Sequence, residues 1–140
     1  MIASELAEWI GDNITSCTFD TTGVSGNVFI SVMPDSPDTV VMVSEYGGIA
    51  DDKNPFSDIN VQCRVRGTRD PRVSYNIAKE IFDELIGLTN TTLISSGSHV
   101  IKVVAQNTPI DIGRDDNNRH EWTVNFQIEV SDVGSNRSYS

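Results

Sequence analysis

The fold is decided by the stretch INVQCRVR, residues 59–66, in which apolar and polar side chains alternate without interruption. Alternation with a period of two predicts a β-strand that buries one face and exposes the other. Gly67 ends the pattern. Asp70 and Pro71 then supply a helix N-cap and a proline at the first helical position, where its missing N–H costs no hydrogen bond. The stretch therefore predicts a half-buried strand that leads directly into a helix.

Two amphipathic helices are predicted, one at the start of the chain and one after Pro71. Apolar residues recur in both at the spacing of a single helical face, and Gly87 is a natural stop for the second helix. The apolar residues are Ile2, Leu6, Trp9 and Ile10 in the first helix, and Ile77, Ala78, Ile81, Phe82 and Leu85 in the second.

Further strands are predicted where β-branched or alternating runs occur, over 28–33, 39–46, 100–105 and 122–130. The first two are separated by PDSPD, residues 34–38, whose prolines interrupt a ladder, so a β-hairpin is the simplest arrangement. The polar or glycine-rich segments 16–27, 47–57, 89–98 and 109–119 are predicted to be loops.

This order of elements lacks the regular strand–helix alternation of a parallel α/β sheet. We therefore expect an α+β fold, with a largely antiparallel sheet that carries the N-terminal and central helices on one face. A single domain is predicted over residues 1–130. The polar residues 131–140 are predicted to form a flexible C-terminal tail.

Composition limits the classes of function. Ten basic and twenty acidic residues give a net charge of −10, which disfavours tight binding of nucleic acid. No apolar run approaches the ~20 residues of a membrane span, and the acidic N-terminus does not resemble a secretory signal, so we expect a soluble protein made in a cytoplasm. Cys17 and Cys63 are predicted to be free, buried thiols.

The acidic segment 111–121 is the place that most resembles a chemical site, because clustered carboxylates hold Mg²⁺ or Ca²⁺. Its glycine precedes the acids, unlike the order in a calcium-binding loop. We therefore favour an acidic turn bridged by its own Arg114 and Arg119, with no metal or cofactor. The remote alternative is a metal-dependent nuclease. Its ligands would be Asp111, Asp115, Asp116 and Glu121.

A basic set lies on the polar face of strand 59–66 and at the start of the following helix. It has no interleaved aromatic residues on which bases would stack, so contact with an acidic protein neighbour is at least as good an interpretation as binding of phosphate. The set is Arg64, Arg66, Arg69 and Arg72. Phe56 in the glycine- and aspartate-rich segment 47–57 is a candidate anchor for a partner, with burial in the core as the equal alternative.

The ordered motifs of the chain resemble those of the phage minor capsid or tail-terminator family over roughly residues 1–130. They are EYGG at 45–48, VQCRVRG at 61–67, Arg69-Asp70 at the start of a helix, IGRD at 112–115 and VNF at 124–126. The segment 116–118 departs from the family pattern, because Asp-Asn-Asn stands where an acid and a glycine turn are expected.

The resemblance implies a structural, non-enzymatic subunit that forms a hexameric ring. The ring would dock on the last ring of the tail tube protein, stop its growth and present a surface to the head–tail connector or stopper protein. It would lie in the virion at the head–tail junction, without a membrane, and genomic DNA would pass through its lumen without specific binding. The nearest alternative is a head-completion or stopper protein of the neck.

Two hypotheses about contacts follow. The polar face of strand 59–66 is expected to pack near Asp115 and Asp116 of a neighbouring copy, and the loop around Phe56 is expected to order against the tail tube. The predicted interface residues are Phe56, Arg64, Arg66, Arg69, Arg114, Asp115, Asp116 and Arg119.

Overall fold

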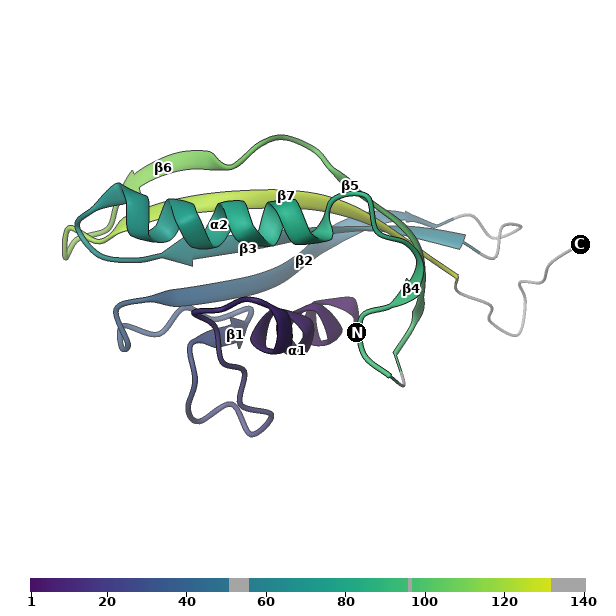
Figure 1. The fold of residues 1–140 in the computed structure, drawn as a ribbon, viewed down its shortest axis with the longest axis horizontal. Coiled ribbons are helices and arrows are strands. Elements are labelled where there is room, and N and C mark those ends of the chain that lie inside the picture. Colours follow the sequence, from purple (N-terminus) through teal and green to yellow (C-terminus); the bar gives the residue numbers. More distant parts are fainter. Residues whose placement is uncertain (51–55, 96, 132–140) are drawn as a thin grey trace, which may run out of the picture.

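The computed structural model describes residues 1–50, 56–95 and 97–131, except for the side chains of residues 48–50 and 56 (Figure 1). This part of the chain contains two helices and one seven-stranded sheet, which confirms the predicted α+β fold. The elements are α1 (Ile2–Asn13), β1 (Val28–Ile30), β2 (Val40–Ala50), β3 (Phe56–Arg66), α2 (Pro71–Leu85), β4 (Thr89–Thr92), β5 (His99–Ala105), β6 (Ile110–Arg114) and β7 (His120–Ser131).

The sheet has the strand order β1-β2-β3-β7-β5-β4, and β6 also pairs with β7. The long strands β2, β3 and β7 form its centre. Strands β5 and β6 lie along the same side of β7, where β5 pairs with residues 126–130 and β6 with residues 120–123. Among the described strands, every pairing is antiparallel except that of β1 with β2.

The predicted hairpin between the first two strands is wrong. Strand β1 ends at Ile30, earlier than predicted, and pairs in parallel with β2, with Val28 opposite Val41. Ser31 takes a positive φ of 59°, and residues 31–39 then carry the chain back to the end of the sheet from which β1 started. A parallel pair needs such a returning connection, whereas a tight turn would have reversed the strand.

Three predicted loops contain strand residues. Segment 47–57 is shorter than predicted, because β2 continues to Ala50 and β3 begins at Phe56; residues 51–55 lie outside the described part. Segment 109–119 contains β6, and segment 89–98 contains β4. Strand β6 was missed because a bulge next to Gly113 breaks its alternation, and β4 because its sequence, TNTT, is polar throughout.

Both helices cover one face of the sheet and bury the core there (Figure 1). Phe126 lies at the centre of this core with no exposed surface. Cys17 and Cys63 are free and buried, as predicted, and burial raises the pKa of both thiols to about 12. Neither helix in the described residues is long and apolar enough to span a bilayer.

The opposite face of the sheet, here called the outer face, carries polar side chains that bond to one another across the strands. The Tyr46 hydroxyl donates to Gln106 at 2.8 Å, and the Gln106 amide donates to Asn60 at 2.9 Å. Gln62 donates to Asn125 at 3.0 Å. Neither helix covers this face, so the alternation predicted for residues 59–66 separates the core from a polar surface.

Candidate assembly surfaces

A buried arginine holds the loop that connects β1 to β2. Arg66 is the last residue of β3 and occupies an outer-face position, but it is only 3% exposed. Its Nη2 donates to the carbonyl oxygens of Pro34 and Pro37, both at 2.7 Å, and of Asp35 at 3.3 Å. Its Nε donates to the carbonyl oxygen of Asp38 at 2.9 Å. One side chain thus fixes the path of the loop through its main-chain acceptors.

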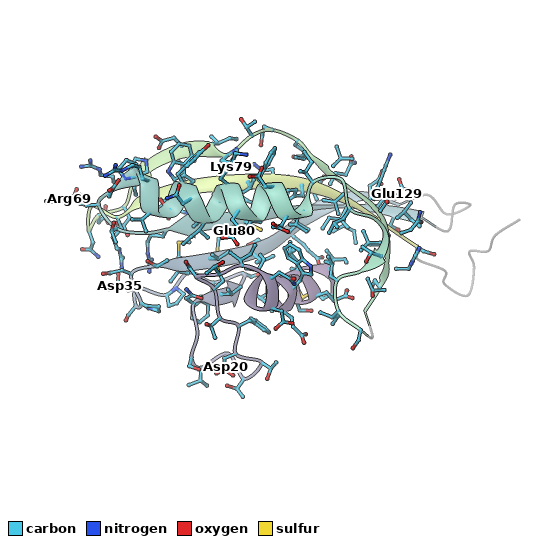
Figure 2. All side chains as sticks on the ribbon, in the orientation of Figure 1. Asp20, Asp35, Arg69, Lys79, Glu80 and Glu129 are labelled. Atoms are coloured by element: carbon cyan, nitrogen blue, oxygen red, sulfur yellow. The ribbon has the colours of Figure 1, made fainter. Side chains whose placement is uncertain are left out.

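A second buried arginine joins the same loop to the turn before β7. Arg119 forms ion pairs with Asp115 at 2.8 Å, Asp35 at 2.7 Å and Asp38 at 3.2 Å. Hydrogen bonds to Asp35 raise the pKa of Arg119. Figure 2 shows Asp35 and Arg69 at the same end of the molecule. A polar pocket of about 520 Å³ lies there, between the loop 31–39, the segment that joins β3 to α2 and the turn before β7. Its lining residues are Asp35, Ser36, Asp38, Thr68, Arg69, Asn117, Asn118 and Arg119.

Arg64, Arg66 and Asp115, which we expected to face a neighbouring copy, all have partners within one copy. Arg64 binds Glu121 through two hydrogen bonds of 2.8 and 3.0 Å on the outer face. Asp115 binds Arg119, and Arg66 is occupied by the carbonyl oxygens of its own loop. These contacts leave little of Arg66 for a neighbour.

The remaining predicted interface residues differ from this group. Arg69, Arg114 and Asp116 are exposed, and in the described part of the chain none of them has an ion pair. The main chain of Phe56 pairs with Ser131, whereas its side chain and residues 51–55 lie outside the described residues. Arg72, the last member of the predicted basic set, pairs with the helix N-cap Asp70 at 2.8 Å.

The carboxylates of the acidic segment do not converge on one point. Asp111 bonds to His120 at 2.7 Å, Asp115 to Arg119, and Glu121 to Arg64. Among the described residues, no group of three or more His, Cys, Asp or Glu side chains is placed to hold a metal ion. The turn is bridged by Arg119, as predicted, whereas Arg114 forms no ion pair with it among the described residues.

These ion pairs predict a dependence of stability on pH. Partial burial alone would raise the pKa of Asp115, but hydrogen bonds from Arg119 outweigh it and hold the pKa below its ordinary value. Hydrogen bonds from Arg72 lower the pKa of Asp70 to about 2. A carboxylate with a lower pKa in the folded state stabilises the protein above its unfolded pKa, and this stability is lost as the pH falls.

We therefore expect the urea midpoint of unfolding to decrease as the pH falls from about 5 to about 2. The decrease should be smaller in the double variant Asp70→Asn/Asp115→Asn, measured at each pH by circular dichroism. Asp116→Asn is the matched control, because Asp116 has no ion pair in the described residues. Equal pH dependence of the double variant and the unchanged protein would contradict the expectation.

Comparison with solved structures shows that the fold occurs in a known particle. A chain of the structure described as "Virion of native gene transfer agent (GTA) particle" has a similar fold, with a TM-score of 0.59 and 14% sequence identity. The alignment covers 92% of this chain and 96% of that chain. No curated protein sequence matches. The fold is thus one that a virion subunit uses.

The family can be stated more closely. The family model described as "Bacteriophage tail terminator protein" matches residues 4–132, which is nearly the whole chain. The chain therefore belongs to the bacteriophage tail terminator family and is a structural phage protein. The resemblance predicted from the sequence is confirmed.

Proposed function

We propose that this chain caps the phage tail tube as a ring, stops tail polymerisation and forms the surface to which the head is joined. The observation that carries the proposal is the family match over residues 4–132. The role is structural and needs no catalytic group or cofactor. The ring is a hexamer whose partners are the tail tube protein and the head–tail connector or stopper protein.

The distribution of charge supports this role. Two of the predicted interface arginines, Arg66 and Arg119, bind groups within their own subunit and hold the loop 31–39. The exposed Arg69, Arg114 and Asp116 are predicted interface residues that have no ion pair within the described residues and can contact a partner. Because the net charge is −10, the wall of the lumen would offer DNA phosphates few basic side chains to bind. The genome therefore slides through without specific binding.

Deletion of the gene from its phage tests the proposal. Without a terminator, tube subunits continue to add, so we expect tails of unregulated, greater length in electron micrographs, with normal length restored by the gene in trans. Heads that fill and then lose DNA beside tails of normal length would instead indicate a stopper protein. Tails of normal length with stable heads would refute both roles. The mass of the intact assembly released from purified tails, divided by the mass of one chain, gives the number of copies in the ring.

A further inference from the structure

Exposed apolar side chains gather at two opposite edges of the sheet. Near β1, Val24 is 84% and Val32 is 54% exposed, and a groove of about 200 Å³ is lined in part by Phe19, Phe29 and Ile30. Along β6, Ile110 is 39% and Ile112 is 43% exposed. Figure 1 shows β6 along one edge of the sheet and β1 at the opposite edge. Two different apolar surfaces on opposite sides suit a head-to-tail contact between identical copies.

The pairing register places Phe29 of β1 and Ile110 of β6 in the same row of residues across the sheet. Phe29 lies opposite Met42, and Met42 lies opposite Arg64. The row continues from Arg64 to Thr123 and from Thr123 to Ile110. Residues of one row project from the same face of a sheet, so Phe29 and Ile110 both belong to the outer face. A copy joined edge to edge without a vertical shift therefore brings Ile110 beside Phe29 of its neighbour.

The strand directions are also compatible. Strand β1 is parallel to β2, and three successive antiparallel pairings then lead through β3 and β7 to β6, so β6 runs opposite to β1. Rotation about an axis that runs along the strands leaves these directions unchanged. Strand β6 of one copy would consequently lie antiparallel to β1 of the next, which is the commoner arrangement in sheets.

One cation and one carboxylate at the two edges are complementary. Arg114 at the end of β6 is exposed and has no ion pair within the described residues. Asp20 lines the groove beside β1 and accepts hydrogen bonds from Thr22 and Ser25, which lower its pKa. Figure 2 shows Asp20 on the loop that extends beyond β1. A cation at one edge and a carboxylate that stays ionised at the other would attract each other across such a contact.

We propose that copies of this chain join with β6 of one beside β1 of the next, placing Ile110 against Phe29 and Ile112 at the neighbour's groove. Side chains carry this contact rather than a long backbone ladder. The Thr18 carbonyl already accepts the N–H of Val28, and Pro109, which precedes β6, has no N–H to donate. The inference deepens the proposed function, because it names the interface that closes the ring.

Cysteine crosslinking tests the contact. If the side chains of Ile110 and Phe29 touch across the contact, cysteines at these two positions come within reach of a short thiol crosslinker. In the double variant Phe29→Cys/Ile110→Cys we expect a ladder of covalent multimers, both in purified tails and in concentrated protein. The native Cys17 and Cys63 are buried and should not react. Each single variant should give no ladder beyond a covalent dimer.

The matched control is Phe29→Cys/Ile86→Cys. Ile86 is 45% exposed, close to the value for Ile110, but follows α2 and is not in the edge row. A ladder in the control pair equal to that of the test pair would overturn the inference. The inference would also be overturned if the test pair gave no ladder in tails that carry the protein and have normal length. The proposed function would stand in that case. A ladder in the test pair, together with unchanged tails after gene deletion, would refute the terminator role and leave the interface.

Discussion

Replacement of Arg66 by alanine is expected to lower the free energy of unfolding by about 3 kcal/mol. The side chain is almost fully buried, and its guanidinium satisfies four main-chain carbonyl oxygens of residues 34–38. Its removal leaves those acceptors without a charged donor and frees the returning loop from β3. The change should appear as a lower urea midpoint with little change in the slope of the transition.

The matched control is Arg114→Ala, which removes an arginine that is exposed and has no ion pair in the described residues. This variant should remain within about 0.5 kcal/mol of the unchanged protein. Arg66→Lys should be intermediate, because one ammonium keeps the charge but does not reproduce the planar set of donors. Equal midpoints for Arg66→Ala and Arg114→Ala would show that the loop does not depend on Arg66.

Phe126→Ala is expected to cost about 3 to 5 kcal/mol, which is the range for aromatic residues deleted from a core. Phe126 has no exposed surface and lies on the central strand β7, opposite Val61 of β3 and Ala105 of β5. The cavity would therefore open at the centre of the core, between the middle strands of the sheet and the helices. Thermal or urea unfolding measures the loss.

Gln127→Ala is the control for this substitution, because the next residue of β7 points to the outer face and is only partly buried. A change within about 0.5 kcal/mol is expected there. Similar losses at Phe126 and Gln127 would contradict the assignment of the two faces. A loss at Phe126 below about 1 kcal/mol would mean that the site collapses around the missing ring.

The elements that were predicted correctly are those whose signal is local. Residues 59–66 and 122–130 alternate without a break because each strand has one face on the core and the other on the polar surface. Asp70 and Pro71 mark the start of α2, where the Asp70 carboxylate accepts the Arg72 N–H at 3.0 Å. These signals involve neighbouring residues only, so they can be read without knowing the fold.

The pairing of strands and charges depends on residues far apart in the chain. Arg64 meets Glu121 across 57 positions, and Arg119 meets Asp35 across 84. No spacing rule connects such residues, so the sequence does not reveal the partners that Arg64 and Asp115 have within one copy. Their contacts with a neighbouring copy stay a prediction. The exposed Ile110 was missed because it lies in a segment predicted to be a polar loop.

The sequence by itself determined that this protein is an acidic α+β domain with a polar-faced sheet, and its motifs placed it in the tail terminator family. Only the tertiary structure decided that β1 runs parallel to β2, that β6 lies at an edge, and that two arginines fix the loop 31–39. The physical reason is that alternation and capping reflect interactions within one element. Strand direction and ion-pair choice reflect the free energy of contacts that form only when distant segments meet.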